Sequence, residues 1–379
     1  MPKQRKTDKQ LEEIYESGQY RVSQERNDFL IPQIIDFVNT RQWINIRPEY
    51  QRRLVWDKGK KSRFIESLLM NIPVPPVFLF ENELSRYEVM DGQQRINSIL
   101  EFYENTLPLS GLEKWTDLNG RTYAECPPIV QRGFDRRRLS AVVLLAESKS
   151  FGAGREDIRK LVFERLNTGG LTLKPQELRN CLYAGPFNEM LIALAGQRLF
   201  DEIWEIPPYE DNLRHGHANR ALADNNLYRR MADCEIVLRF FAFREKERIK
   251  GSVRNILDSC MERHRAVDET TRREWSQRFL SLLHLAKEIF GKDTFRITDR
   301  DGDRKLSQPL YDAVMVSLDR LYERRQALLT NKARIVEQLS RKLRQKAFYA
   351  LVVGRPNTAD AVKTRLRKVE LLFRRVAGV

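Results

Sequence analysis

Cysteine and histidine are scarce in this sequence, and long apolar runs are missing. The chain has four cysteines and four histidines among 379 residues. The cysteines, at positions 126, 181, 234 and 260, never form a close pair, which argues against a zinc ribbon and against a disulfide-stapled scaffold. No apolar run approaches the ~18 residues of a membrane span, and the basic N-terminus lacks the apolar stretch of a secretory signal. We therefore expect a soluble, cytoplasmic protein with no membrane partner.

Length and composition indicate a folded chain with more than one domain. The residues are 41% hydrophobic and 31% charged, which is ordinary for a globular protein and sufficient for a sizeable core. Short apolar runs and apolar residues at helical spacing alternate only in the first half of the chain. The expected strands lie at 44–46, 77–80, 87–90 and 139–146, and the expected helices of this half lie at 8–18, 29–43, 59–70, 157–166 and 175–184.

The second half of the sequence reads as helical almost throughout. From about residue 186, apolar residues recur every three or four positions, with loops expected at 205–223 and 291–304. The predicted fold class is therefore α+β, with an all-helical C-terminal domain. The expected divisions are an N-terminal arm at 1–24, a mixed α/β domain at 25–185 and a helical domain at 186–379.

Positive charge is concentrated at the C-terminal end. The whole chain carries a net charge of +15, and residues 331–379, with thirteen basic and three acidic side chains, supply +10 of it. Such a segment suits a nucleic-acid backbone, because each neutralised phosphate releases counterions. The alternative is a solvated helix surface that keeps the protein soluble. The candidate DNA contacts are Arg341, Lys342, Arg344, Lys346, Lys363, Arg365, Arg367 and Lys368.

A short segment, Asp91-Gly-Gln-Gln-Arg95, joins an expected strand to an expected helix. The first turn of a helix attracts anions through its free amides and its dipole, and Arg95 adds a bidentate phosphate donor. Gln93 and Gln94 can bind phosphate oxygens or an attacking water, and Asp91 can hold Mg²⁺. The alternative is a capping box, with Asp91 as N-cap and Gln94 three residues later.

Two further segments are rich in polar and basic residues. Residues 50–56, Tyr-Gln-Arg-Arg-Leu-Val-Trp, either present guanidinium groups and aromatic rings to a nucleotide or form an edge segment whose Trp56 enters the core. Residues 163–180 predict two helices around a glycine turn. They fit a DNA-binding helix-turn-helix, a polar loop that closes over the Asp91–Arg95 segment, or a glycine C-cap between packed helices. Gln51, Arg52, Arg53, Gly92, Asn167 and Thr168 are the candidate nucleotide-binding residues of these segments.

His215-Gly-His217 is the only close pair of histidines. With Asn219 and Asp224 nearby, it offers a weak hint of a metal nuclease. No third ligand stands at a defined spacing, so the sequence assigns no metal site.

These blocks, taken in order, resemble a known family. Residues 50–52, Phe64-Ile-Glu-Ser-Leu-Leu69, residues 75–81 and Tyr87–Arg95 resemble the ParB/sulfiredoxin-like domain. They are more closely similar to the branch at the N-terminus of GmrSD-type modification-dependent restriction enzymes. Residues 167–170 and 176–180 also resemble that branch, and the likeness covers roughly 25–245.

The resemblance implies a module that binds and hydrolyses nucleoside triphosphates in bacterial defence against phage or other foreign DNA. Carried over, Asp91, Gln93, Gln94 and Arg95 would be catalytic, with Mg²⁺ accompanying the nucleotide, and Arg52 would lie at the nucleotide site. Two departures matter. No cysteine adjoins the motif, which excludes sulfiredoxin chemistry, and the C-terminal half does not resemble the nuclease domain that often follows this module.

Three functional hypotheses follow from the sequence. The first is an NTP-hydrolysing, DNA-sensing component of a restriction or anti-phage system that signals to a separate nuclease or defence protein. The second is a metal-dependent DNA endonuclease or nickase, and the third is a non-enzymatic DNA-binding adaptor. The sequence leaves open which nucleotide is bound, which DNA mark is sensed and whether the chain forms a homo-oligomer.

Overall fold

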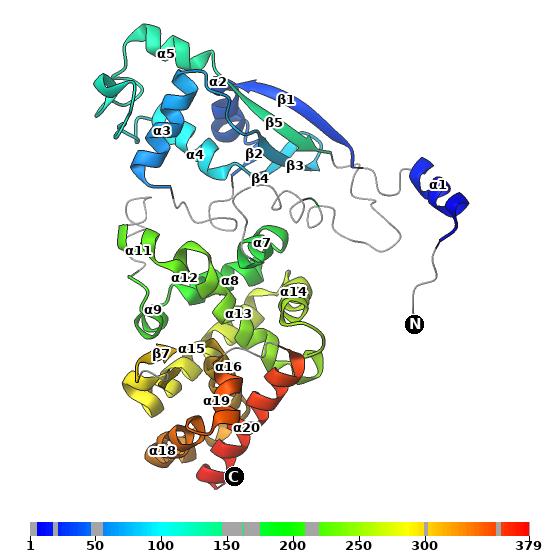
Figure 1. Cartoon of the computed structure of the whole chain (residues 1–379), viewed down its shortest axis with the longest axis vertical. Coiled ribbons are helices and arrows are strands. Elements are labelled where there is room, and N and C mark those ends of the chain that lie inside the picture. Colours follow the sequence, from blue (N-terminus) through cyan, green and yellow to red (C-terminus); the bar gives the residue numbers. More distant parts are fainter. Residues whose placement is uncertain are drawn as a thin grey trace. The chain divides into compact units, whose positions relative to one another are not determined.

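The computed structural model describes residues 6–17, 22–46, 56–145, 162, 175–208, 220–298, 302–353 and 358–378. The chain folds as two compact units, Met1–Leu173 and Lys174–Val379 (Figure 1). The division lies about a dozen residues before the boundary expected near 185, because helix α7 (Pro175–Leu182) packs against helices of the second unit. The predicted α+β class is confirmed, with a five-stranded sheet in the first unit and a largely helical second unit.

The sheet of the first unit has the strand order β1-β5-β3-β4-β2. Strand β3 pairs antiparallel with β4 and parallel with β5, while β5 pairs antiparallel with β1 and β4 pairs parallel with β2. Apolar residues of β3 and β5, such as Leu79 and Val143, are buried, as expected for central strands. The strands span Gln24–Leu30 (β1), Ile44–Asn45 (β2), Val77–Glu83 (β3), Arg86–Asp91 (β4) and Arg138–Leu144 (β5).

Four helices pack together beside the sheet and enclose the core of this unit (Figure 1). They are α2 (Ile31–Ile35), which continues as a π-helical turn to Thr40, α3 (Lys58–Leu69), α4 (Gln93–Tyr103) and α5 (Pro128–Asp135). Asp57 caps α3 by accepting a hydrogen bond from the Lys60 amide at 2.7 Å. A separate polar helix, α1 (Asp8–Glu16), precedes β1 and buries no residue.

A buried carboxylate, that of Glu66 on α3, fixes the loop before the short 3₁₀ turn Thr116–Leu118. Its oxygens accept hydrogen bonds from the backbone amides of Glu113, Lys114 and Trp115 at 3.1, 2.7 and 2.8 Å. Burial alone raises the pKa of Glu66, but these amide donors more than offset it and hold the pKa below its ordinary value.

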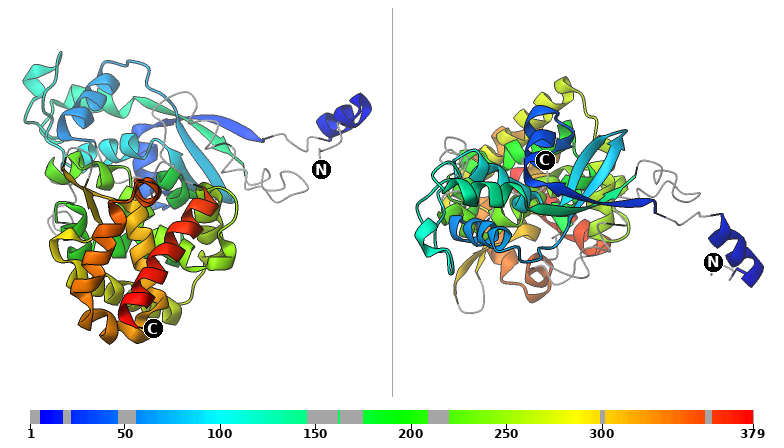
Figure 2. Two further views of the ribbon diagram at one scale, coloured as in Figure 1. Left: turned by 60° about the horizontal axis from the view of Figure 1, so that its bottom comes forward. Right: turned by 90° about the horizontal axis from the view of Figure 1, so that it is seen from above.

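The second unit is a helical assembly around one large apolar core. Its central helices are α13 (Ala232–Arg244), α15 (Glu269–Phe290) and α16 (Gln308–Arg320), and the long terminal helix α20 (Ala359–Ala377) packs along α16 (Figure 2). Its other helices are α8 (Pro186–Ala195), α9 (Arg198–Trp204), α11 (Arg220–Asp224), α12 (Asn226–Arg229), α14 (Val253–His264), α17 (Arg325–Thr330), α18 (Lys332–Leu343) and α19 (Lys346–Val352), with 3₁₀ turns at Lys246–Arg248, Gly291–Asp293 and Tyr322–Arg324.

Two strand features differ from the sequence prediction. Strand β1 was not predicted, because Gln24-Glu-Arg-Asn-Asp is polar and the strand lies at the sheet edge with most side chains exposed. The second unit is also not purely helical. The loop expected at 291–304 contains strand β6 (Arg296–Thr298), which pairs antiparallel with β7 (Arg304–Leu306) at the end of that loop. Both strands are too short for a periodic signal. Within the described ranges, no helix is both long enough and apolar enough to span a bilayer.

Candidate functional site

The bend between β4 and α4 requires glycine at position 92. Gly92 has φ +102°, and a Cβ placed there would lie 2.4 Å from Val77 Cγ1 on the neighbouring strand. Both the backbone conformation and the lack of space exclude larger residues. Glycine thus lets the chain turn from strand into helix directly above β3, and the first intrahelical bond runs from the Ile96 amide to the Gly92 carbonyl at 3.0 Å.

Arg95 is held inside this bend by two acceptors. Its Nη2 lies 2.6 Å from Asp91 Oδ2, and its Nη1 donates to the Pro75 carbonyl at 2.7 Å. The Arg95 side chain is 10% exposed, whereas that of Asp91 is 48% exposed. The guanidinium therefore braces β4 and the loop before β3 against the first turn of α4, and the carboxylate keeps one side open to solvent.

The capping-box interpretation of this segment is wrong. The N-cap of α4 is Gly92, no side chain caps the helix, and the Asp91 carboxylate is taken up by Arg95. Arg95 instead binds Asp91 and the Pro75 carbonyl across the bend at Gly92. A sequence pattern does not separate this arrangement from a capping box, because both place Asp just before a helix.

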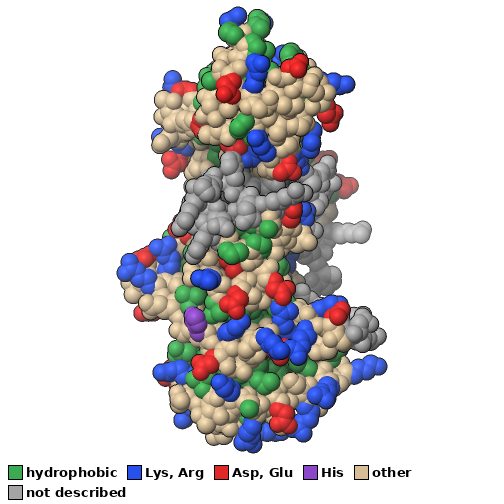
Figure 3. All heavy atoms as spheres, turned by 90° about the vertical axis from the view of Figure 1, so that its left-hand side faces the viewer, with side chains coloured by type: hydrophobic (Ala, Val, Ile, Leu, Met, Phe, Trp, Pro, Cys, Tyr) green, Lys and Arg blue, Asp and Glu red, His purple; other side chains and the backbone are tan. Residues whose placement is uncertain are grey.

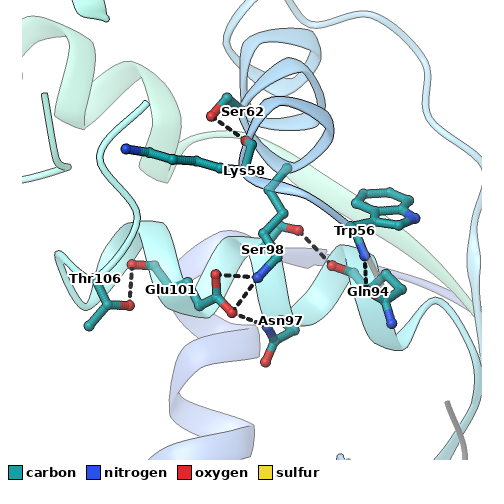
Figure 4. A network of polar contacts seen from close by, with 9 residues as sticks. Trp56, Lys58, Ser62, Gln94, Asn97, Ser98, Glu101 and Thr106 are labelled. Atoms are coloured by element: carbon teal, nitrogen blue, oxygen red, sulfur yellow. Dashed lines mark hydrogen bonds and ion pairs between the residues drawn. The ribbon is translucent and has the colours of Figure 1, made fainter. Parts of the chain in front are cut away.

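Gln94 connects the bend to the end of the 50–56 segment. Its Oε1 accepts a hydrogen bond from the Trp56 amide at 3.3 Å, and its backbone carbonyl accepts one from Ser98 Oγ at 2.7 Å (Figure 4). The Trp56 ring packs edge-on against Phe64 and lies under Lys60. Gln93 and Gln94 are each 4% exposed. The motif therefore positions the point at which the 50–56 segment enters helix α3.

A buried ion pair lies about two helical turns further along α4. Lys61 Nζ donates to both carboxylate oxygens of Glu101 at 2.7 Å, and Asn97 donates to the same carboxylate (Figure 4). The side chains of Lys61 and Glu101 are 4% and 12% exposed. This pair fixes α3 against α4, and both residues were missed from sequence because the partners are 40 residues apart.

Asp91 is the residue of this bend that can take a metal ion. Mg²⁺ is usually bound through one or two carboxylates and several waters, and the half-exposed carboxylate of Asp91, whose Oδ2 binds Arg95, offers one such ligand. Gln51, Arg52, Arg53, Asn167 and Thr168, predicted to bind nucleotide, lie outside the described residues, as do His215 and His217.

The helix-turn-helix interpretation of 163–180 is not supported by its second helix. Gln176, Arg179 and Asn180 on α7 are at most 2% exposed. Arg179 binds Asp258 at 2.7 Å and Glu235 at 2.8 Å, and Gln176 donates to Asn180 at 2.8 Å. These polar residues form a buried network inside the helical unit, so they are unable to read DNA bases in this structure. The first helix of the motif lies outside the described residues except Val162.

The basic C-terminal segment places most of its candidate DNA contacts at the surface. Arg341, Arg344, Lys346, Lys363 and Arg367 are exposed. Lys342 and Lys368 are half-buried. Basic side chains are also scattered over the helical unit on the face shown in Figure 3.

Arg365 corrects the prediction for this segment. It is 0% exposed and donates to Asp312 Oδ2 at 2.8 Å, so it does not contact DNA. Arg239 also donates to Asp312, from Nε to Oδ1 at 2.9 Å and from Nη2 to Oδ2 at 2.5 Å. One buried carboxylate therefore binds two buried arginines. Among the described residues, Arg365 Nε and Nη1 find no acceptor. Burial lowers the pKa of Arg365 despite the opposing attraction of Asp312.

One group of potential metal ligands emerges that the sequence did not suggest. Glu245, Cys260 and His264 place their donor atoms within 4.8 Å of one another. His264 Nε2 lies 2.6 Å from Glu245, which also pairs with Arg263. Cys260 and His264 lie four residues apart on α14, and this spacing was the sequence signal that could have indicated a shared helix face. The Glu245 carboxylate is thus shared between Arg263 and His264, and all three side chains remain partly exposed.

Residues 31–184 match the family model of the GmrSD restriction endonuclease, N-terminal domain. The matched region contains the β3–β4 hairpin, the Asp91–Arg95 bend and α7. No curated protein and no solved structure matches the chain. The match supports a GmrSD-type N-terminal domain in this part of the chain and a role in a restriction system.

Proposed function

We propose that this chain is the nucleotide-hydrolysing, DNA-binding component of a restriction system directed against foreign DNA. One observation carries the proposal: Gln94, inside the Asp91–Arg95 bend, holds the backbone of Trp56, the last residue of the basic 50–56 segment. Two segments separated by more than thirty residues thus meet at the first turn of α4, where anions are favoured. The GmrSD-type match over 31–184 supports the same assignment.

Each residue of the bend has a distinct role in this proposal. Arg95 would shift part of its hydrogen bonding from Asp91 to a phosphate, because a guanidinium has five N–H donors and this one uses two for the bonds described. Asp91 would bind Mg²⁺ with the phosphates, and Gln93 or Gln94 would orient water for attack on the γ-phosphorus. The bond from the γ-phosphorus to the bridging oxygen breaks, giving a nucleoside diphosphate and inorganic phosphate.

Release of inorganic phosphate from each of the four NTPs with Mg²⁺ tests this activity. Wild-type protein should turn over at least one of them, and Arg95→Ala should abolish the reaction. Arg86→Ala, at the exposed start of β4, is the matched control and should retain it. Because Arg95 also braces the fold, Asp91→Asn provides a second test, and circular dichroism checks that each variant is folded. A wild-type protein that binds no NTP by calorimetry would contradict the proposal.

A non-enzymatic DNA-binding adaptor is the second candidate, and a specific observation favours it. Arg95 is 10% exposed, and both of its described hydrogen bonds go to the protein itself. Under this alternative the bend is only structural. No NTP should then raise the melting temperature, since only a ligand of the folded state does so, while DNA affinity should still fall steeply with salt.

A further inference from the structure

A cavity of about 700 Å³ opens into the helical unit, well away in sequence from the Asp91–Arg95 bend. It is formed by the end of α15, the β6–β7 hairpin, α16, α18 and α19, the yellow to orange segments of Figure 2. Its volume lies in the range of about 300–1,000 Å³ that small-molecule sites occupy.

The walls of this cavity are apolar and only partly covered. Phe295 and Leu310 line it and are buried, at 1% and 2% exposure. Phe290, Leu343 and Tyr349 line it while remaining half-buried. The Phe295 ring already packs against Trp204 and Tyr311, so the rings of Phe290 and Tyr349 supply the flat apolar surface that a planar ligand would remove from water.

The rim of the cavity is strongly basic. Arg296, Arg304, Arg344 and Lys346 line it, against a single acidic residue, Asp293. Arg296 pairs with Glu205 and Arg304 with Asp293. Arg344 and Lys346 are exposed at the junction of α18 and α19, where the sequence had placed DNA contacts. A ligand with a negative group beside a planar apolar body is complementary to this arrangement.

We propose that the cavity binds one nucleoside monophosphate unit, with the base against the aromatic walls and the phosphate at Arg344 and Lys346. A purely apolar ligand would leave the basic rim unused, and a free phosphate would leave the walls uncovered. The unit is either a free mononucleotide or one nucleotide of single-stranded DNA. In its DNA form the inference rests on the proposed function, whereas binding of the mononucleotide is independent of it.

Fluorescence titration of the full-length chain tests this site. The probe is 2-aminopurine deoxyribonucleoside monophosphate, and the protein carries Arg95→Ala so that the β4–α4 bend contributes no binding. We expect saturable quenching of the probe, at least tenfold weaker binding in Arg344→Glu and a similar loss in Tyr349→Ala, because stacking on an aromatic ring is worth about 1–3 kcal/mol per base. Arg341→Glu is the matched control: it makes the same charge change on α18 at an exposed residue that does not line the cavity, and it should alter affinity less than twofold.

Two further measurements complete the test. A single-stranded oligonucleotide with one 2-aminopurine identifies the source: quenching that depends on Arg344, seen here but not with the mononucleotide, would assign the cavity to DNA. Equal losses in Arg344→Glu and Arg341→Glu would reveal diffuse electrostatic attraction and overturn the proposal. So would competition by inorganic phosphate as strong as that by the unlabelled mononucleotide. Phosphate release by protein with an intact Arg95 is scored separately, so failure at the cavity leaves the proposed NTPase untouched.

Discussion

Two buried ion-pair clusters, one in each unit, differ in how their opposite charges are matched. In the sheet unit, buried cations pair one to one with carboxylates, as in Lys61–Glu101, and the Arg95–Asp91 pair leaves its carboxylate 48% exposed. In the helical unit, the fully buried Asp312 accepts hydrogen bonds from both Arg239 and Arg365, so two buried guanidinium groups share one carboxylate. A half-open pair can exchange its partner for a ligand, whereas a closed, shared carboxylate can only hold helices together. We therefore expect the Arg95–Asp91 pair to take part in ligand binding, and the Asp312 cluster to contribute mainly to stability.

Removal of the shared carboxylate should have the largest effect. Asp312→Ala leaves two buried guanidinium groups without a counter-charge, and we expect a loss of about 3–5 kcal/mol in the unfolding free energy. Urea unfolding followed by far-UV circular dichroism measures it. Asp293→Ala breaks the exposed pair with Arg304 and should cost less than about 1 kcal/mol. Equal losses of unfolding free energy in the two variants would show that Asp312 contributes no more to stability than an exposed carboxylate does.

The two arginines provide a finer test of the same cluster. Arg239 makes two bonds with Asp312 and Arg365 makes one, with two further nitrogens lacking acceptors among the described residues. Arg365→Met should therefore destabilise the protein less than Arg239→Met in the same urea experiment. The opposite order would mean that the number of hydrogen bonds to Asp312 does not determine how much each arginine contributes to stability.

A substitution in the glycine bend should have the next largest effect. Gly92→Ala adds a Cβ that overlaps Val77 and forces alanine to φ +102°, so we expect a loss of about 2–4 kcal/mol. Gly120→Ala is the matched control, with φ +86° but open space around it. Differential scanning calorimetry compares them. A similar cost at both positions would indicate that backbone strain alone, and not the contact with Val77, fixes glycine at this bend.

Glu66 links the stability of the sheet unit to pH. Its folded pKa lies below the ordinary 4.5, so its contribution is fully present above that pH and is lost as the pH falls further. Glu66→Gln should lower stability by about 1–3 kcal/mol at pH 7, and the difference from wild type should shrink in acid. Glu113→Gln, at an exposed carboxylate in the loop that Glu66 holds, is the control. A Glu66→Gln effect that is constant from pH 7 to pH 3.5 would rule out this linkage.

The exposed basic residues of α20 should affect DNA binding alone. Replacing Lys363 and Arg367 with Gln should reduce the salt dependence of DNA affinity by about two counterions and leave stability within about 0.5 kcal/mol. Fluorescence anisotropy at several salt concentrations measures the slope. Arg273→Gln, exposed on α15 outside the basic segment, should leave it unchanged. An identical change of the salt dependence in both proteins would show that the basic segment is not part of the DNA-binding surface.

Sequence patterns predicted the elements that carry apolar periodicity. The buried strands β3, β4 and β5, helix α3 and the turn from β4 into α4 all follow from local runs of apolar residues and from one glycine. Strand β1 escaped prediction because an edge strand exposes most of its side chains and shows no apolar alternation. The β6–β7 hairpin escaped because strands of three residues are too short for a pattern.

Side-chain partners distant in sequence account for the errors at the candidate site. Arg365 lies on the apolar face of α20, between Val362 and Val369, whereas Arg367 lies on its exposed face. Arg365 is buried with its charge because Asp312, 53 residues earlier, binds it across α16 and α20. Arg179 on α7 similarly finds Glu235 and Asp258. The change from strand to helix at 91–95 was predicted from sequence, but sequence alone did not reveal that Arg95 binds Asp91. Residue type and spacing identify charge, whereas burial depends on which other helix supplies the opposite charge.

A crystal structure of the protein with a non-hydrolysable nucleoside triphosphate and Mg²⁺ tests the central claim most directly. The account predicts phosphate oxygens at the first turn of α4, with Arg95 donating to them and Asp91 turned toward the metal ion. A structure in which saturating nucleotide leaves Arg95 on Asp91 and the Pro75 carbonyl, with no phosphate near α4, would contradict it.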